Sequence, residues 1–297
     1  MSMAAVRERV IDGRTYFYLE HSLRHGDRVE KRERYLGAIL PKDLDRIKRE
    51  FMDELHRELW FKDFDRIKSG YEGQRKVLPP SAREKATEAF ATTFTYNTNR
   101  IEGSRLTLRE TASLLEDGIA PGSRPLSDIK EAEAHRDAFY EMLGYKRDVS
   151  MQTVLYFHRR LLEGTKRDIA GKLRDHEVRI SGSRFVPPLP VEIYPLLQAF
   201  FKWYGKSKVR LHPVELAALV HLRLVTIHPF TDGNGRVSRL MMNHVLDKHG
   251  FPMLDIPYEK RAGYYHALER SQVKGDDTIF LHWFFKRYLA ENKRYIE

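Results

Sequence analysis

A twelve-residue segment, His228 to Arg239, reads HPFTDGNGRVSR and combines side chains that can move a proton with groups that bind phosphate. Its turn, Gly233 to Gly235, leads into a stretch of helical character. The first N–H groups of a helix have no partner within it, so a helix that begins at such a turn offers a binding site for phosphate. Arg236 and Arg239 lie three residues apart, so both can face this pocket, and planar guanidinium groups suit phosphate oxygens.

Asp232 and His228 have different roles beside such a pocket. A carboxylate repels phosphate, and its favourable role is to hold Mg²⁺, which proteins bind through one or two carboxylates together with substrate phosphates. The arginines and the helix N-terminus disfavour the charged form of His228, which leaves a neutral base that can accept a proton. Taken alone, a Gly-Asn-Gly turn is common and a single histidine is ordinary. The ordered set of base, metal ligand and anion pocket is what indicates an active site.

The segment resembles the motif of the Fic family, His-x-Phe-x-Asp/Glu-Gly-Asn-Gly-Arg-x-x-Arg, and matches it at every specified position. The resemblance extends over residues 80–290. In that family the histidine activates a target hydroxyl, the acidic residue holds Mg²⁺, and the turn with its two arginines binds a nucleoside triphosphate. The resemblance therefore implies that His228 is the base and Asp232 the metal ligand. It implies nucleotide contacts from Gly233, Asn234, Gly235, Arg236 and Arg239.

Two other segments resemble parts of the same family. GKLRDHEVRISGSRFVPP, residues 171–188, resembles a Gly-x-x-Arg segment followed by a flap that positions the target. Its alternation around Ser-Gly-Ser also predicts a small β-hairpin over residues 176–188. RAGYYHALERSQVKGD, residues 261–276, resembles the segment after the motif helix: Tyr264 matches a tyrosine of the nucleotide pocket, and Gln272 stands where some members carry asparagine. The flap residues that the resemblance assigns are Val178, Arg179, Ile180 and Ser181.

TNRIEG, Thr98 to Gly103, resembles the family's inhibitory motif, Ser/Thr-x-x-x-Glu-Gly/Asn. Thr98 and Glu102 are four residues apart and share one face of a helix. Taken alone, a glutamate followed by glycine is also a common helix end. In the family this glutamate pairs with the second arginine of the motif, here Arg239, and blocks the productive position of the γ-phosphate.

The resemblance implies a protein adenylyltransferase that transfers AMP from ATP to a Tyr, Thr or Ser hydroxyl of a protein, and the chain itself is one candidate target. An alternative at the same site is removal of AMP, with Glu102 positioning a water molecule. A different class of function is a nucleic-acid-binding module, in which Tyr16, Phe17, Tyr18 and Tyr35 near the N-terminus would stack on bases. We expect nucleic acid not to be a partner, because alternating aromatics in a strand are more often a hairpin core. A homodimer is compatible with the resemblance.

Composition is compatible with an enzyme of this kind. The 297 residues carry 52 Lys and Arg against 42 Asp and Glu, a formal net charge of +10, and contain no cysteine. Disulfides, thiolate metal sites and cysteine nucleophiles are therefore excluded. The basic residues are mixed with acidic ones, which is typical of a solvated surface. No apolar stretch has the length of a membrane span, so we expect a cytoplasmic protein.

The elements that must position these residues are mostly helices. Alternation over residues 14–36 around His25-Gly26-Asp27 predicts a β-hairpin. Apolar residues at helical spacing predict a helix that ends before a loop at Gly70 to Gly73; these residues are Leu44, Ile47, Phe51, Leu55 and Leu59. Capping boxes at Ser81–Glu84 and Thr107–Glu110 and a cap at Ser127 predict the starts of the next three helices. Further helices are expected at 151–163, 191–204, 214–226, from the motif to 249, and around 278–289.

We therefore expect a mainly α protein: a Fic-type helical core with a small β-hairpin flap, preceded by an N-terminal β-hairpin and a helical extension. The expected domains are a hairpin region at 1–40, a helical linker at 41–78 and a catalytic domain at 79–297, which includes the inhibitory helix.

Overall fold

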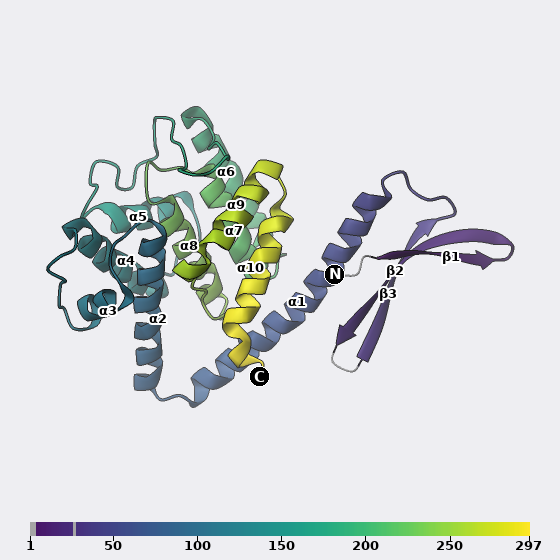
Figure 1. Ribbon diagram of the computed structural model, residues 1–297, viewed down its shortest axis with the longest axis horizontal. Coiled ribbons are helices and arrows are strands. Elements are labelled where there is room, and N and C mark those ends of the chain that lie inside the picture. The colour runs from purple at the N-terminus through teal and green to yellow at the C-terminus, as the bar shows by residue number, and fades with distance from the viewer. Residues whose placement is uncertain (1–3, 26–27) are drawn as a thin grey trace. The chain divides into compact units, whose positions relative to one another are not determined.

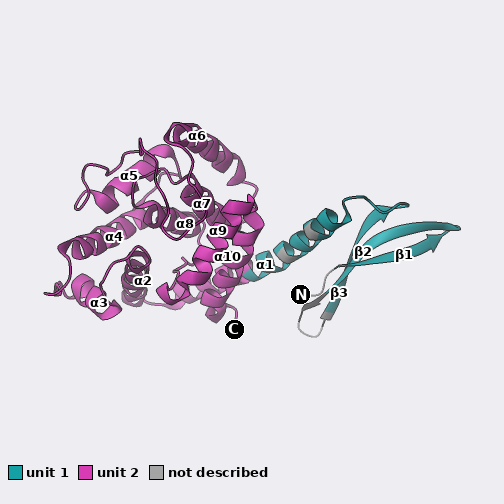
Figure 2. Cartoon of the chain, turned by 45° about the horizontal axis from the view of Figure 1, so that its top comes forward, with its two compact units in different colours: residues 1–63 teal, residues 64–297 magenta. Residues whose placement is uncertain are grey.

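The computed structural model describes residues 4–25 and 28–297. The chain divides into two compact units, residues 1–63 and 64–297, coloured separately in Figure 2. The division falls within one long helix, α1 (Leu44–Val77). No helix among the described residues is long and apolar enough to cross a membrane.

The N-terminal unit contains a three-stranded antiparallel sheet in the order β1-β2-β3 (Figure 1), with β1 at Ala5–Ile11, β2 at Arg14–His25 and β3 at Arg28–Gly37. The hairpin predicted over residues 14–36 is confirmed by the pairing of β2 with β3. Its predicted turn at Gly26–Asp27 lies outside the described residues. Strand β1 was not predicted; Asp12 and Gly13, with φ of 50° and 76°, turn the chain from β1 into β2.

The core of this unit forms where α1 meets the sheet. Leu19 of β2 is fully buried with Ala4, Phe51 and Leu55. Partly buried Leu44, Ile47 and Leu59 pack against this cluster. The apolar spacing predicted for this helix is therefore the face that packs on the sheet.

Helix α1 does not end at Gly70, as the sequence predicted, but continues to Val77. Glycine weakens a helix interior, so a different requirement must hold it there. A Cβ on Gly70 would overlap the carbonyl oxygen of Tyr295. The glycine therefore permits a close approach of the C-terminal segment rather than a loop.

The second unit is a bundle of helices (Figure 1). They are α2 (Pro80–Ile101), α3 (Leu108–Glu116), α4 (Leu126–Gly144), α5 (Met151–Leu162), α6 (Pro190–Ser207), α7 (Pro213–Ile227), α8 (Asn234–Lys248), α9 (Arg261–Lys274) and α10 (Asp277–Asn292), with short 3-10 turns at Tyr258–Lys260 and Lys293–Tyr295. Helices α7 and α8 are buried along most of their length and form the centre of the bundle. A mainly helical fold is thus confirmed.

Two of the three predicted helix starts were wrong. The capping box at Thr107 and Glu110 is confirmed, with reciprocal bonds between side chains and backbone. Helix α2 instead begins at Pro80 after Pro79, and α4 begins at Leu126 after Pro125, with no side-chain cap in either case. In α2, Pro80 takes the first helical position, where its fixed φ suits the helix and its missing N–H costs nothing, one residue before the predicted Ser81 cap. In α4, Pro125 is itself the N-cap, so Ser127 lies inside the first turn.

The hairpin predicted for the flap was also wrong. Residues 176–188 contain no strand, and their backbone forms one turn, in which the N–H of Ser183 donates to the carbonyl of Ile180 at 3.1 Å. Arg184 fastens the segment to α9 through Glu269, at 2.9 Å. Alternation predicts strands only where a second strand can pair with them.

Candidate active site

His228 ends α7 in a left-handed backbone conformation, with φ 50° and ψ 57°. Asp12 is the other non-glycine residue with positive φ among the described part of the chain. This conformation is uncommon outside glycine, so neighbouring contacts must hold it. The first contact is a bond from the His228 N–H to the carbonyl of Leu224, at 3.2 Å, which closes the last turn of the helix.

Arg174 holds the backbone on the other side of His228. The Nε of Arg174 donates to the His228 carbonyl at 2.9 Å, and its backbone N–H donates to the Pro229 carbonyl at 3.0 Å. Its two terminal nitrogens donate to the carbonyls of His176 and Pro188 at 2.9 and 2.6 Å. One buried side chain therefore joins the start and end of the flap to the backbone of the candidate base.

The ring of His228 is oriented as a base. Its Nδ1 lies 3.2 Å from the carbonyl oxygen of Val225, which can only accept, so Nδ1 carries the proton and Nε2 is left with a lone pair. Burial lowers the pKa of His228 below its ordinary value, and Arg174 lowers it further. The side chain is thus neutral near pH 7 and can accept a proton at Nε2.

Asn234 shapes the loop that follows. Its side-chain oxygen accepts from the N–H of Phe230 at 3.0 Å, and its side-chain nitrogen donates to the carbonyl of Phe230 at 2.8 Å. Gly233, with φ 78°, caps the start of α8. Both polar atoms of the Asn234 side chain are therefore bonded to the loop. Asn234 can still bind phosphate through its backbone N–H at the helix N-terminus.

Asp232 lies in a cluster of four charges. Its Oδ2 accepts from Lys166 and from Arg236, the latter at 3.2 Å. Glu131 of α4 contacts the same two cations, at 3.4 Å for Lys166 and 2.5 Å for Arg236. Burial alone would raise the pKa of Asp232, but Arg236 and Lys166 hold it at about 2. The carboxylate is therefore ionised at neutral pH.

This carboxylate fits a metal that arrives with a nucleotide. The described residues contain no group of three or more His, Asp or Glu side chains that could hold a metal ion by themselves. Mg²⁺ at phosphate sites is commonly held by one or two carboxylates plus phosphate oxygens. Asp232, ionised and next to the N-terminus of α8, fits such a role.

His158 of α5 fixes the register between this loop and the one that carries Lys166. The N–H of Gly171 donates to Nδ1 of His158 at 2.9 Å, so Nε2 carries the proton and donates to the Asp232 carbonyl at 2.9 Å. The ring also stacks on Phe230, with centroids 3.6 Å apart. Burial lowers the pKa of His158 to about 4, so the ring stays neutral.

Arg239 contacts the end of α2. Its NH2 donates to Glu102 Oε1 at 2.7 Å and to the Thr98 carbonyl at 3.2 Å, and its Nε donates to the Thr98 hydroxyl. Its NH1 lies 3.3 Å from the hydroxyl of Tyr264. Arg239 is 1% exposed, so its guanidinium is held on every side by α2 and α9. Arg236 and Arg239 therefore serve different acidic groups, Asp232 and Glu102.

Glu102 brings a carboxylate to the N-terminus of α8. It is the C-cap of α2, where the helix dipole disfavours a negative charge. Gly235 lies in the first turn of α8, and a Cβ there would overlap Glu102 Oε1. The carboxylate thus lies against the first turn of α8, where the helix N-terminus favours a negative charge, and it pairs with Arg239.

A cavity of about 430 Å³ joins these groups. Its lining includes Glu102, His228, Gly235, Arg239, Tyr264 and Tyr265, together with flap residues Ile180 to Ser183. The ring of Tyr264 is 1% exposed, and its hydroxyl contacts both Arg239 and His221. Tyr265 is 47% exposed, and its hydroxyl donates to the Ile101 carbonyl at 2.8 Å. The more accessible wall on α9 is therefore Tyr265, and Tyr264 orients Arg239.

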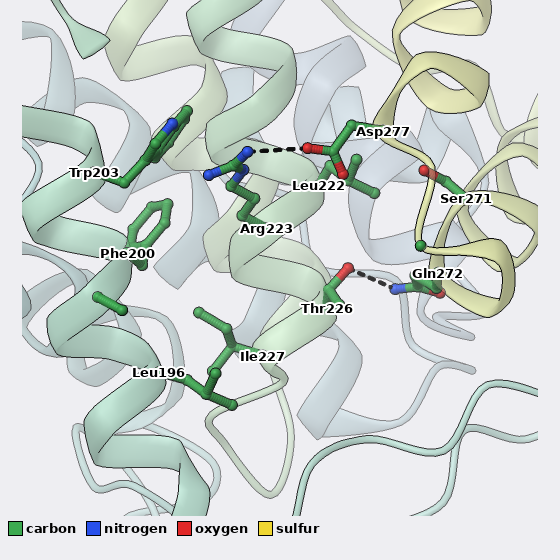
Figure 3. Close-up of a pocket in the computed structure, with 12 residues that line it drawn as sticks. Leu196, Phe200, Trp203, Leu222, Arg223, Thr226, Ile227, Ser271, Gln272 and Asp277 are labelled. Atoms are coloured by element: carbon green, nitrogen blue, oxygen red, sulfur yellow. Dashed lines mark hydrogen bonds and ion pairs between the residues drawn. The ribbon is translucent and has the colours of Figure 1, made fainter. Parts of the chain in front are cut away.

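The remaining predicted residues lie at the edge of this cavity. Ile180 and Ser181 line it, whereas Val178 and Arg179 precede them in the flap outside its lining. Gln272 lines it and also a second cavity of about 480 Å³ (Figure 3), where its side chain donates to the Thr226 hydroxyl at 3.1 Å. On the far side of that cavity Arg223 stacks on Trp203, 4.0 Å from the ring centroid.

Known proteins resemble this chain in sequence and in fold. Residues 148–246, which contain α5 to α8 apart from the last residues of α8, match the Fic/DOC family. The chain is 35% identical over 200 residues, 66% of its length, to the protein adenylyltransferase Fic of Drosophila sechellia. The chain belongs to the Fic/DOC family. It spans about two-fifths of the length of that relative, 39%.

Solved Fic structures share the fold. A Fic-domain signalling protein of Bacteroides thetaiotaomicron aligns with a TM-score of 0.71 and 27% identity over 79% of this chain and 95% of its own. Fic-1 of Caenorhabditis elegans aligns with a TM-score of 0.70 and 28% identity over 85% of this chain and 74% of its own. The helical Fic fold expected from the motif is thus confirmed.

Several residues of this Fic site had no signal in the sequence analysis. The sequence indicated Arg174 only as the end of a Gly-x-x-Arg segment, and it indicated Tyr264 and not Tyr265 for the nucleotide pocket. Lys166, His158 and Glu131 contact the motif from 66 to 105 residues away along the chain. Long-range partners of this kind have no spacing that a single sequence can show.

Proposed function

We propose that this chain is a protein adenylyltransferase that transfers AMP from ATP to a hydroxyl side chain of a protein. The observation that carries the proposal is the bare Nε2 of His228 on the same cavity as the N-terminus of α8 and Arg239. A base next to an anion site is the arrangement that hydroxyl attack on a phosphate requires. The name of the Drosophila relative, protein adenylyltransferase, supports the same reaction.

In this reaction the target hydroxyl gives its proton to Nε2 of His228 as its oxygen attacks the α-phosphorus. A bond forms between that oxygen and phosphorus, and the bond from the α-phosphorus to the bridging oxygen breaks, so that pyrophosphate leaves. The backbone N–H groups at the start of α8 and the guanidinium of Arg239 would stabilise the charge on the phosphates. Asp232 would hold Mg²⁺, which when bound neutralises charge on the nucleotide.

The flap supports a protein target. Residues 176–188 form no strand pairing, and Ile180 to Ser183 line the cavity that contains His228. An extended target segment could therefore add alongside this backbone and present its hydroxyl to the base. Arg174 joins the flap to His228, so the target and the base would be positioned by the same side chain.

The same cavity supports inhibition by Glu102. The carboxylate takes one donor of Arg239 and lies against the first turn of α8, where a γ-phosphate would bind. Glu102→Gly should raise transfer of label from α-³²P ATP by about tenfold or more, since each 1.4 kcal/mol removed from the blocked state is about tenfold in population. Label from γ-³²P ATP should stay off protein.

Two variants serve as controls. Asp117→Gly removes an exposed acidic residue at the C-cap of α3 and should leave labelling unchanged. Glu102→Gly combined with Arg239→Ala should fall back to weak labelling, because the freed arginine is the source of the gain. Equal labelling by wild type and Glu102→Gly would show that Glu102 is only a helix end.

Removal of AMP is the alternative reaction at the same site. Glu102 lines the cavity with His228, so its carboxylate could position a water molecule for attack on a modified side chain. Wild-type chain incubated with an AMP-modified target would then release AMP, whereas transfer releases pyrophosphate from ATP. Measuring the two products in parallel separates the two reactions.

The N-terminal sheet gives little support to nucleic-acid binding. The rings of Tyr16 and Tyr18 both pack against Tyr35, with centroids 6.2 and 5.3 Å from it. Cations of the same face are paired: Arg9 contacts Glu33, and Lys31 contacts Glu33 at 3.2 Å. Paired cations contribute less to phosphate binding than free ones.

A further inference from the structure

Lys166 contacts Asp232, the carboxylate that would hold Mg²⁺ in the proposed reaction. Its ammonium contacts Asp232 Oδ2, while Oδ1 accepts from the N–H of Gly233 at 2.6 Å. Arg236 also contacts Oδ2, at 3.2 Å. Both oxygens of Asp232 are therefore engaged by groups of the chain itself, and a divalent cation cannot coordinate Oδ2 while an ammonium group stays in contact with it.

We propose that Lys166 is a built-in counter-ion of Asp232, which the metal of an incoming metal–nucleotide complex must displace. The inference rests on the proposed function and adds a residue that controls how strongly nucleotide binding depends on the metal. Lys166 would stabilise the site when no metal is present and oppose metal binding when it is.

Lys166, rather than Arg236, is the cation that moves. Arg236 is 2% exposed, and its NH1 is bonded to Glu131 at 2.5 Å. The side chain of Lys166 is 42% exposed, and an ammonium on a four-carbon stem can change partners without moving its backbone. Its ammonium already lies 3.4 Å from Glu131 Oε1, so a metal that displaces Lys166 from Asp232 would leave it paired with Glu131.

The backbone around Lys166 is fixed, which makes the exchange a side-chain event. The Lys166 N–H donates to the Leu162 carbonyl at 2.7 Å at the end of α5. Farther along the same loop, His158 ties Gly171 to the carbonyl of Asp232. The loop and the motif are therefore held in register while the ammonium is free to leave.

The exchange predicts two affinity changes of opposite sign when Lys166 is replaced by methionine. With metal, the competitor is gone, so a metal–nucleotide complex should bind more tightly. Without metal, the Asp232 carboxylate has lost one of its two counter-ions and repels phosphate more strongly, so free nucleotide should bind more weakly. The ratio of the dissociation constant in EDTA to that in Mg²⁺ should rise by about twofold to fivefold, the scale of a partly exposed ion pair.

The experiment is calorimetry with α,β-methylene ATP, which cannot undergo transfer, on Glu102→Gly chain so that Glu102 does not compete. Lys166→Met is compared with Lys166→Arg, which keeps a competing cation and should resemble the parent. Lys172→Met removes an exposed charge from the same loop and should not raise the ratio. Asp232→Ala should make the affinity nearly independent of Mg²⁺.

Two results would overturn the inference. An unchanged ratio in Lys166→Met would show that Lys166 does not compete with the metal. Weaker binding both with and without Mg²⁺ would show that Lys166 binds phosphate directly. The proposed function can fail separately. If the Lys166 variants in the Glu102→Gly background show the expected affinity changes but Glu102→Gly chain transfers no label from α-³²P ATP, the displacement of Lys166 stands and the adenylyltransferase activity is contradicted.

Discussion

At the scale of single residues, His228 has its reactivity set by two contacts that the motif does not encode. Its Nδ1 donates to the carbonyl of Val225, and its backbone carbonyl accepts from Arg174. The first contact leaves Nε2 as the only ring atom that can act as a base. The second maintains a left-handed backbone that a histidine rarely adopts.

The pH dependence expected of the proposed transfer follows from this environment. Because burial lowers the pKa of His228 below 6.5, Nε2 stays unprotonated where a solvated histidine would be half charged. In Glu102→Gly chain the transfer rate should therefore fall to half of its plateau at a pH below 6.5. The free energy of unfolding changes in the same direction. Because the pKa of His228 is lower in the folded chain than in the unfolded chain, the unfolded chain binds the proton first as the pH falls, and the protein loses stability.

Rates measured above and below pH 6.5 with α-³²P ATP check the prediction, with His228→Ala as the reference. That variant should lose transfer and keep nucleotide affinity, because the phosphates are held by other groups. A half-maximal rate near pH 6.5 would instead assign an unshifted pKa to the base.

The motif predicted which residues gather at the site but not what each one touches. Sequence order indicated a base, a carboxylate and two arginines at a loop-to-helix junction. It did not show that the side chain of Asn234 bonds to the backbone of Phe230 or that Arg236 contacts Asp232 and Glu131. Those partners depend on side-chain direction and on residues far along the chain, neither of which spacing fixes.

At the scale of elements, the site is made where helix ends meet. The end of α7 provides His228, the start of α8 provides the anion site, and the end of α2 provides Glu102. Helix ends expose unpaired backbone groups and carry the partial charges of the dipole. The flap joins this arrangement through Arg174.

Arg174→Lys should slow transfer by about tenfold to a hundredfold with little change in nucleotide affinity, since misplacement of a reacting group by about 1 Å costs about that much. A lysine ammonium cannot span the carbonyls of His228, His176 and Pro188 as the guanidinium does. Transfer rates and calorimetry in the Glu102→Gly background measure the two effects. Arg210→Lys, at an exposed position, is the control, and a full rate in Arg174→Lys would remove Arg174 from the positioning of the base.

Elements were predictable where local signals agreed and failed where they did not. Apolar periodicity predicted α1 and α5 to α8. Strand β1 was missed although Asp12-Gly13 is a strong hairpin signal, because the surrounding strand is short and charged. Two other predictions were wrong for the opposite reason. Alternation predicted a hairpin over residues 176–188, which form no strand, and Gly70 predicted the end of a helix that continues past it because Tyr295 packs closely there.

At the scale of the whole molecule, the division between units falls inside α1 and not at its end. Phe64 and Ile67 are fully buried, and the ring of Phe64 packs edge-on against Phe285 and Tyr288 of α10. The last turns of α1 therefore belong to the core of the second unit. Sequence composition could not show this, because the helix carries no break at the boundary.

Two truncations test the boundary. Residues 64–297 should fold and melt close to the full chain, whereas residues 79–297, the domain expected from the sequence, should melt on the order of 10 °C lower. The second truncation removes Phe64 and Ile67, and loss of one buried phenylalanine costs about 3–5 kcal/mol. Thermal unfolding by circular dichroism measures both, and equal melting temperatures would place the boundary at the end of α1.

The charges of the site are arranged in two pairs, Glu102 with Arg239 and Lys166 with Asp232, and a bound nucleotide and its metal would replace one partner of each pair. On nucleotide binding, Glu102 would leave Arg239 as one anion replaces another, and Lys166 would leave Asp232 as one cation replaces another. Before that exchange the charges of the cavity cancel in pairs, because Glu102 offsets Arg239 and Lys166 offsets Asp232. A ligand gains its affinity here from contacts made after it arrives, and long-range attraction contributes little to the speed of its encounter with the site.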